Sequence, residues 1–318
     1  MAGLPLTLAN ALQELTAAHD GARLEKDAKN ISEAYRMRTG TGKRLLTREN
    51  EAAAYAAARM PATYEAARAA LDSALASSGL APKTLLDCGA GTGAASWAAH
   101  DLLNLESITC LEREDAMRSV GSALMRAGGG AMEHAIWQAF DLTDKQPLPS
   151  AELVVEGYML GELAPEMRIP VAKKLWEACT QMLLLIEPGT PQGFANLAAV
   201  RRELAGAFVA APCPAGCQNC PMTGEDWCHF AVRVQRTKLH KQLKGGDAPY
   251  EDEKFCYLAL MKTPPSEPCA ARVLRHPLIA PGKITLTLCE AGEKKIRTVT
   301  KKDPLWKRAR KIGAGDGL

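Results

Sequence analysis

A glycine-rich turn between an apolar run and a helix-like segment restricts the fold of this chain more than any other feature. The apolar run in "LLDCGAGTGAAS" ends in Asp87, and three glycines follow at alternate positions: Gly89, Gly91 and Gly93. Glycines suit a turn where a ligand lies against the backbone and where a side chain would block packing of strand on helix. The turn therefore predicts a buried strand that passes into a helix beside a ligand site.

The surrounding sequence alternates short apolar runs with helical segments. The apolar runs are "TLLDCG", "SITCLE", "IWQAFDL", "ELVVEGYML" and "QMLLLIEP", and one of the intervening helices is expected around 165–180. This βαβαβ order predicts a parallel sheet covered by helices on both faces. The pattern stops near Arg202, and strand-like runs return in "KFCYLALMK", "ITLTLCE" and "IRTVTKK".

These changes in composition and hydrophobic pattern divide the chain into four segments. Residues 1–80 are rich in Ala, Leu, Arg and Glu and are expected to be helical, with Pro61 interrupting a long helix. Residues 81–202 form the expected α/β core, and 203–253 form a cysteine-rich, basic insertion. Residues 254–318 hold the returning strands and a basic tail.

The spacing of the glycine turn distinguishes between two cofactors. The dinucleotide fingerprint has the form G-x-G-x-x-G, whereas this turn reads G-x-G-x-G with an acid two residues before the first glycine. That form resembles motif I of class I methyltransferases that use S-adenosylmethionine (SAM). The resemblance implies a Rossmann-like class I methyltransferase fold and favours SAM over NAD and over a purely structural turn.

Three acids near the strand ends are candidate SAM ligands. Asp87 and nearby backbone groups are expected to bind the amino-acid part of SAM, directly or through water. Glu112 ends the second predicted strand, where an acid accepts hydrogen bonds from ribose hydroxyls. Asp141 in "FDL" resembles the position that contacts the adenine amine. Together with Gly89, Gly91 and Gly93, these acids form the predicted cofactor site.

The fourth predicted strand ends in "VVEGYMLGELAPE", where enzymes of this fold place residues that face the substrate. Glu156, Tyr158 and Glu162 are candidate substrate contacts, although two loop acids and a packing tyrosine explain them equally well. Methyl transfer needs positioning more than side-chain chemistry. No catalytic residue is therefore assigned, and both methyl transfer and SAM binding without turnover stay open.

The segment "CPAGCQNCPMTGEDWCHF" contains four of the ten cysteines, spaced C-x3-C-x2-C-x7-C. The first residues of the chain lack the basic region and long apolar run of a secretory leader, so we expect a reducing cytoplasm, where clustered thiolates bind metal. Cys217 and Cys220 form a C-x2-C pair as in zinc sites. Cys213 and Cys220 each precede a proline, as cysteines that bind iron–sulfur clusters sometimes do. His229 is a candidate ligand, although a packing or phosphate-contacting role is favoured.

Several pieces together resemble one family. "PCP", "CPM", "DWCHF", "EDEKFCYLAL", "ITLTLCEAGE" and "KRARK" accompany the glycine motif, from about Tyr55 to the basic tail. They resemble the methyltransferase-like family of small-ribosomal-subunit assembly factors, found in bacteria and in mitochondria. The resemblance implies a 4Fe–4S cluster held by three cysteines of this segment and a distant fourth. Matched piece by piece, these are Cys213, Cys220, Cys228 and Cys289.

This sequence departs from the family pattern within the cysteine segment. An additional Cys217 is present, and Ala215 occupies the place of a family histidine after the first Cys-Pro. Cys217 is therefore an alternative to Cys213 or Cys220, and Cys256 and Cys269 are alternatives for the distant ligand. Zinc stays the alternative metal.

Charge is concentrated in two segments. The net charge is only +3, but residues 294–311 carry nine Lys or Arg against one Asp, and "RVQRTKLHKQLK" (233–244) is also basic. Both segments are expected to be helices that follow an rRNA backbone, with a merely solvated helix as the alternative. We expect a cytoplasmic, bacterial protein that is monomeric away from the ribosome and has no membrane partner.

The combined features predict a SAM-binding, 4Fe–4S-containing, methyltransferase-like protein that acts on small-subunit rRNA during assembly or translation. The first alternative is a non-catalytic assembly or translation factor that uses the methyltransferase fold as an RNA-docking platform. The second alternative is a zinc-binding RNA methyltransferase.

Overall fold

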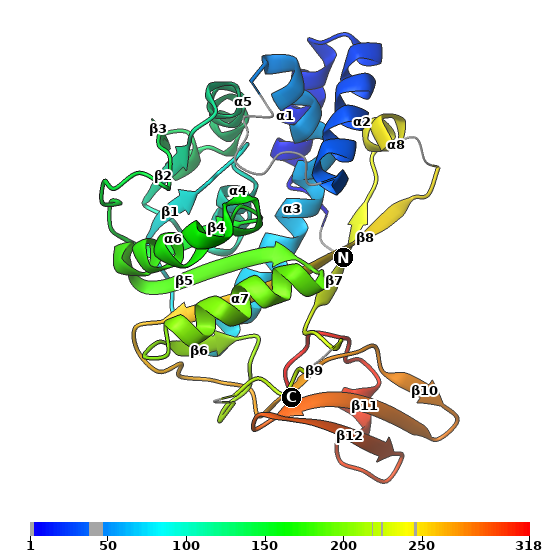
Figure 1. The fold of residues 1–318 in the computed structure, drawn as a ribbon. Helices are drawn as coiled ribbons and strands as arrows, with labels where there is room; N and C mark the ends of the chain where they lie inside the picture. The colour runs from blue at the N-terminus through cyan, green and yellow to red at the C-terminus, as the bar shows by residue number, and fades with distance from the viewer. Residues whose placement is uncertain (1–2, 38–46, 218, 224, 245–246) are drawn as a thin grey trace.

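The computed structural model of the chain describes residues 3–37, 47–217, 219–223, 225–244 and 247–318 (Figure 1). Its helices are α1 (Leu6–Ala17), α2 (Gly21–Met37), α3 (Glu49–Ser78), α4 (Ala94–Leu102), α5 (Asp115–Met125), α6 (Pro165–Ala178), α7 (Pro191–Glu203), α8 (Lys238–Lys244) and α9 (Trp306–Ala309). Its strands are β1 (Thr84–Cys88), β2 (Ser107–Glu112), β3 (Ile136–Ala139), β4 (Ala151–Gly157), β5 (Cys179–Pro188), β6 (Phe208–Ala211), β7 (Phe230–Gln235), β8 (Tyr250–Met261), β9 (Ala271–Val273), β10 (Leu278–Ala280), β11 (Lys283–Glu290) and β12 (Glu293–Thr300).

The larger sheet has the order β3-β2-β1-β4-β5-β8-β6, and β7 pairs with β8. Strands β1 to β5 are mutually parallel, which confirms the predicted parallel α/β core, whereas β8 runs antiparallel to both β5 and β6. The chain order reverses between β1 and β4. In such sheets a ligand crevice opens at the carboxyl ends of the strands next to that reversal.

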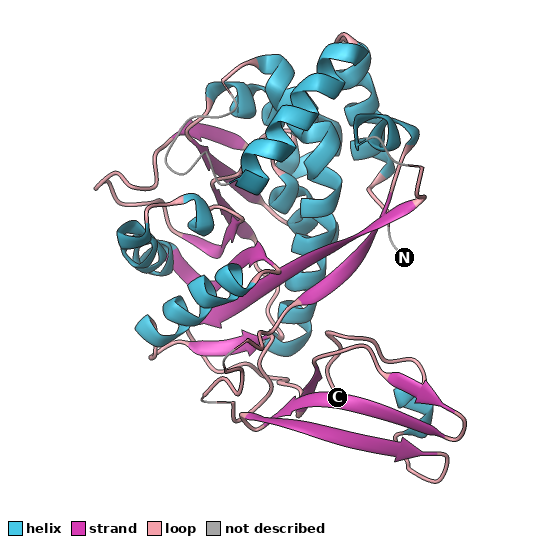
Figure 2. Cartoon of the chain, turned by 45° about the vertical axis from the view of Figure 1, so that its right-hand side comes forward, coloured by secondary structure: helices cyan, strands magenta, loops and turns pink. Residues whose placement is uncertain are grey.

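Helices cover both faces of this sheet (Figure 2). Alternate residues of one strand face opposite cores: Leu85 packs with α3, α4 and α5, whereas Leu86 packs with α6 and α7. This alternation is the period-two pattern of a strand that is buried on both faces. The two cores hold β1 rigidly and so determine where the glycine turn emerges.

Helix α3 runs without a break from Glu49 to Ser78, so the expected interruption at Pro61 is wrong. A proline inside a helix costs about 3 kcal/mol, because its ring removes a hydrogen bond and crowds the preceding turn. Burial compensates here, because the alanines of α3 pack closely against neighbouring helices and strands. The helix ends at Gly79, whose φ of 68° is a left-handed cap.

A second, smaller sheet follows the order β10-β11-β12, with β9 also paired to β11. It lies beside the α/β core in both views, and the cysteine segment runs between the two (Figures 1 and 2). Its own core contains Ile284, Leu286 and Val299. The expected boundary between residues 253 and 254 falls inside β8, which belongs to the larger sheet.

The two basic segments are less helical than expected. The first begins in strand β7, where Arg233 lies opposite Asp252 of β8 and bonds to it at 3.0 Å, and only then enters α8. The second begins in β12, which contains most of the predicted strand-like run "IRTVTKK", and its helix α9 is a single turn. Pairing with β8 overrides local helix propensity in the first segment. Among the described helices, none combines the length and apolarity that a bilayer crossing requires.

Candidate functional site

A cavity of about 300 Å³ opens at the carboxyl ends of β1, β2 and β4. The three glycines of the turn have left-handed φ values of 70°, 56° and 85°. Gly89 and Gly91 line the cavity. Gly93 instead is the N-cap of α4, and a Cβ there would lie 3.0 Å from the Met125 sulfur. The turn thus combines two glycines at the cavity with one that allows close packing of the helix.

Asp87 lies beneath the turn, not in the cavity. Its side chain is 1% exposed, and Oδ2 accepts hydrogen bonds from the Ser96 hydroxyl at 2.7 Å and the Ser96 N–H at 3.1 Å. Burial raises the pKa of Asp87 to about 6, although the Ser96 bonds oppose this shift. The carboxylate therefore anchors the start of α4 to the end of β1.

Glu112 and Asp141 both line the cavity. Glu112 accepts hydrogen bonds from the N–H groups of Gly91 and Glu114, each at 2.9 Å, and burial raises its pKa. Asp141 Oδ1 accepts from the Thr143 N–H at 2.9 Å and from its hydroxyl at 2.7 Å. These hydrogen bonds fix the orientation of both carboxylates. The bond from the Gly91 N–H to Glu112 also stabilises the glycine turn.

The candidate substrate contacts at the end of β4 and just after it comprise one buried acid and two residues that line the cavity. Glu156 is fully buried; Oε1 accepts from the N–H groups of Met159 at 2.6 Å and Leu160 at 3.0 Å, and Oε2 has no partner among the described residues. Tyr158 and Glu162 line the cavity. Glu156 is therefore a structural acid, and the other two candidates face the ligand space.

Tyr158 adopts a left-handed φ of 66°, which is rare for a bulky residue and recurs at functional sites. Its hydroxyl donates to Glu253 Oε1 at 3.3 Å, and the same oxygen accepts from Arg59 Nη2 at 3.2 Å. Burial raises the pKa of Tyr158 above its usual range, so the hydroxyl keeps its proton. Sequence reasoning missed Arg59 and Glu253, because they come from α3 and β8, far apart in the chain.

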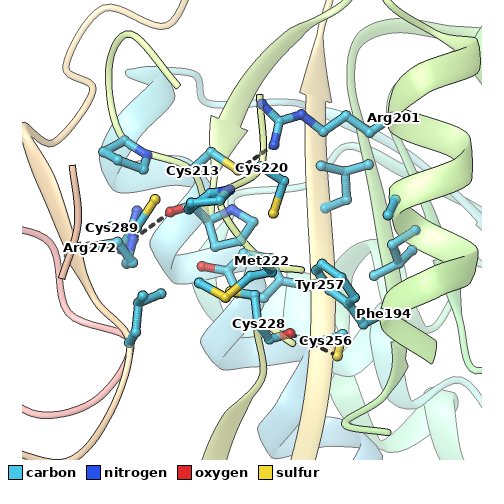
Figure 3. A pocket seen from close by; sticks show the side chains of 17 residues that line it. Phe194, Arg201, Cys213, Cys220, Met222, Cys228, Cys256, Tyr257, Arg272 and Cys289 are labelled. Atoms are coloured by element: carbon cyan, nitrogen blue, oxygen red, sulfur yellow. Dashed lines mark hydrogen bonds between the residues drawn. The ribbon is translucent and has the colours of Figure 1, made fainter. Parts of the chain in front are cut away.

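A second cavity, of about 50 Å³, lies between α7, β8 and the smaller sheet (Figure 3). The four predicted ligands all line it: Cys213, Cys220, Cys228 and Cys289. The thiol of Cys256, on β8, also lines it and donates to the Cys228 carbonyl at 3.1 Å. The structure thus brings a cysteine of β11 to the cysteine segment.

Cys217 is not among the lining residues of this cavity, but it packs in one cluster with Cys213, Cys220, Cys228 and Cys289. Hydrogen bonds that Cys213 and Cys289 donate to its sulfur hold the pKa of Cys217 far below its usual range. His229 packs on the Trp227 ring with centroids 5.1 Å apart, as expected for a packing residue. Cys269 is also absent from the cavity lining.

Two arginines reach the cysteine cavity. Arg201 Nη1 lies 3.1 Å from Cys213 Sγ, and its Nη2 donates to the Cys217 carbonyl. Arg272 is 4% exposed, and its Nη2 has no hydrogen-bond partner among the described residues. Burial raises the pKa of the Cys228 thiol to about 12 and so disfavours its thiolate form.

The cysteine thiols that line this cavity suit a metal ion or cluster that prefers sulfur ligands. Thiolates select zinc and iron–sulfur clusters. In the described part of the chain, no three His, Cys, Asp or Glu side chains are close enough to hold one metal ion. The cavity exceeds the roughly 10–15 Å³ that one water needs. The four thiols, with the unpartnered Nη2 of Arg272 beside them, therefore have the chemistry to hold a thiolate-bound metal group.

Comparison with known proteins finds a matching family, a human relative and several solved structures of similar fold. The human protein "Ribosome assembly protein METTL17, mitochondrial" is 29% identical over 202 residues, which cover 58% of this chain and 43% of that protein. The match thus spans less than half of its length.

Two solved methyltransferases are similar in structure, with TM-scores below 0.5. Magnesium protoporphyrin IX methyltransferase of Synechocystis PCC 6803, with bound SAM, has a TM-score of 0.42 and 12% identity, over 74% of this chain and 97% of that one. N-methyltransferase NodS of Bradyrhizobium japonicum WM9, with S-adenosylhomocysteine, has a TM-score of 0.41 and 11% identity, over 63% and 87%.

A family model described as "Mitochondrial small ribosomal subunit Rsm22" matches residues 49–318. Both cavities lie within the matched residues, as do the glycine turn, the cysteine segment and the smaller sheet. This match extends over most of the chain and confirms the resemblance inferred from the sequence motifs. The chain belongs to the Rsm22 family.

Proposed function

We propose that this protein binds SAM at the glycine turn and a 4Fe–4S cluster at the cysteine cavity, and that it engages small-subunit rRNA during ribosome assembly or translation. The observation that carries the proposal is the family match over 49–318, which includes both cavities. The human relative is named a ribosome assembly protein, and its match covers part of this chain.

The geometry of the first cavity supports SAM as its ligand. Glu112 ends β2 and Asp141 follows β3, so both acids lie beside the exposed backbone of Gly89 and Gly91. An acid at the end of β2 suits ribose hydroxyls. The bonds of Asp87 to Ser96 make its role in SAM binding indirect, through the position of the turn. SAM supplies an electrophilic methyl group when bound.

The side of the cavity near Tyr158 favours a non-catalytic factor as the second candidate. The Tyr158 hydroxyl and the Arg59 guanidinium both bind Glu253, and Glu156 is buried away from the ligand space. None of these three groups is placed to accept a proton from a methyl acceptor. The residues on this side of the cavity are therefore as consistent with a docking platform that binds SAM without turnover as with an enzyme.

The two Cys-Pro pairs and the family resemblance favour a cluster over zinc. A zinc ion gathers its ligands around one centre, whereas each thiolate of a 4Fe–4S cluster binds a different iron. In this proposal, Cys213, Cys220, Cys228 and Cys289 hold the cluster. Its ligation joins the smaller sheet to the α/β core and so contributes to folding.

The end of the smaller sheet supports contact with rRNA. Lys301, Lys302 and Lys307 are exposed in the turn after β12 and in α9. Clustered lysines bind phosphates without reading bases. The partner proposed for this surface is the small subunit.

The test is methyl transfer from labelled SAM to immature small subunits, together with crosslinking of the protein to RNA. We compare the wild-type protein with Gly91→Arg, which fills the ligand space. Transfer that Gly91→Arg abolishes supports the enzyme. Binding of SAM and RNA without transfer supports the docking platform. Absence of RNA crosslinks refutes both. Anaerobic purification with iron, sulfide and zinc analysis separates the cluster from zinc.

A further inference from the structure

Arg272 is a buried cation whose protein neighbours do not balance its charge. Its Nε donates to the Pro212 carbonyl at 2.7 Å, and its Nη1 donates to Ser73 Oγ at 3.1 Å and to the Gly315 carbonyl at 2.9 Å. All three acceptors are neutral, and Nη2 has no partner among the described residues. A charge that is only 4% exposed is costly to bury without a counter-charge.

The fold directs this cation toward the cysteine cavity. Arg272 lies on β9 directly opposite Cys289 of β11, and residues opposite each other in antiparallel strands share one face. Both side chains line the cavity and lie next to each other in Figure 3. The neutral hydrogen bonds tie the guanidinium to three separate segments, so its position is fixed before any ligand arrives.

A metal-loaded cysteine site has the complementary charge. Four thiolates outweigh the double positive charge of a zinc ion or of an oxidised cluster core, so the loaded site remains anionic. Charges that are shielded from water interact strongly, because the effective dielectric constant is low there. A fixed cation beside Cys289 stabilises the loaded site and disfavours the empty one, where it remains unbalanced.

We infer that Arg272 is a positioning residue that balances the charge of the thiolate-bound metal group and so sets how tightly that group is held. This inference rests on the proposed cysteine site and names a residue that contacts the site without ligating metal. It further implies that removing the cation lowers the midpoint potential of a bound cluster, because reduction makes the site more anionic.

The test uses the full chain as wild type, Arg272→Gln, Arg272→Lys and a control, Arg297→Gln. Arg297 is an exposed cation on β12, 3.5 Å from Asp303 and outside the cavity. Each protein is reconstituted anaerobically with iron and sulfide. Metal retention against a chelator, the midpoint potential, and the thermal stability of the loaded and metal-free forms are then measured.

We expect Arg272→Gln to weaken metal retention about 10–100-fold, as is usual for groups that support metal ligands. Arg272→Lys, which keeps the charge, should recover most of this loss, and Arg297→Gln should match the wild type. The stability gained on loading should shrink in Arg272→Gln alone. A purely structural residue would lower the stability of both forms equally.

Two outcomes overturn the inference while leaving the cysteine site intact. One is a loaded wild type together with a folded Arg272→Gln that has unchanged retention and midpoint potential. The other is equal destabilisation of both forms by Arg272→Gln. If Arg272→Gln does not fold, Arg272→Lys decides: loss of metal from a folded lysine variant overturns the inference. A wild type that takes up neither iron nor zinc overturns both the inference and the proposed site.

Discussion

Substitutions in the glycine turn can separate ligand binding from stability, because Gly91 and Gly93 share a left-handed backbone but not their surroundings. Gly91 lines the first cavity, and a Cβ there meets only the Met117 methyl at 3.5 Å, an ordinary contact distance. Gly93 is absent from the cavity lining, and a Cβ there lies 3.0 Å from the Met125 sulfur and 3.6 Å from the Trp137 ring. The same change to alanine should therefore have two different effects.

The magnitudes follow from these distances. A left-handed conformation costs an L-residue about 1–2 kcal/mol, and overpacking a core adds about 1–3 kcal/mol. Gly91→Ala should therefore lower the free energy of unfolding by about 1–2 kcal/mol, and Gly93→Ala by about 2–5 kcal/mol. If SAM lies against the turn, crowding of about 1–3 kcal/mol in Gly91→Ala weakens SAM binding by about 5- to 150-fold.

The assay combines denaturant unfolding without ligand and calorimetric titration with SAM at a temperature where both variants are folded. We expect Gly91→Ala to lose affinity while remaining the more stable variant, and Gly93→Ala to lose stability while binding SAM nearly as the wild type does. Wild-type affinity in Gly91→Ala would refute the placement of SAM at this turn. So would a larger loss of affinity in folded Gly93→Ala than in Gly91→Ala.

Three further predictions concern the thiols, the buried acid and the basic surface. Cys289→Ser should abolish retention of iron and sulfide because its thiol lines the cavity, whereas Cys217→Ser should retain both, as measured by elemental analysis. Burial and the charge of Glu187 raise the pKa of Glu156, so ionisation is penalised in the folded state and stability falls as pH rises above the unfolded carboxyl's range. Glu156→Gln should flatten this fall and raise stability at neutral pH, measured by urea unfolding across pH. Replacing Lys301 and Lys302 by glutamate should weaken rRNA binding and reduce its salt slope by about 1 for each phosphate that the variant no longer binds.

Matched controls make each of these predictions decisive. Serine in place of Cys217 controls for loss of a thiol as such, and metal loss from both variants would contradict the assignment of ligands. Glu106 is exposed, so Glu106→Gln should leave the pH dependence unchanged; an equal effect there would contradict the role of Glu156. Lys145 is exposed in the loop after β3, and equal weakening by Lys145→Glu would show that net charge alone governs RNA binding.

Much of the first site could be predicted from the sequence, because its parts are local. Strand, turn and helix follow one another in Leu85–Gly93 and beyond, and the acids at the ends of β2 and β3 occupy equivalent places in the repeating unit. The role of Asp87 was harder to predict. Its bond to Ser96 depends on how α4 packs against β1, and sequence spacing does not specify that rotation.

Less of the cysteine cavity could be predicted, because pairing between distant strands brings its residues together. The spacing of the thiols indicated metal, and the family resemblance implied Cys289 as the distant ligand. Cys256 was predicted only as an alternative distant ligand, and the contribution of Arg272 was not predicted, since β8 and β9 bring them to the cavity from separate sheets. Local propensity likewise misassigned Arg233, because the pairing of β7 with β8 is decided by tertiary contacts.

The sequence by itself determined the order of elements, the glycine turn and the family, because periodicity, turn chemistry and motif spacing are properties of short stretches. The tertiary structure alone decided which side chains meet. Insertion of β8 between β5 and β6 brings Glu253 to Tyr158, and the pairing of β9 with β11 places Arg272 beside Cys289. Antiparallel register is set by the burial of whole faces, so contacts between distant residues emerge only when the sheets are complete.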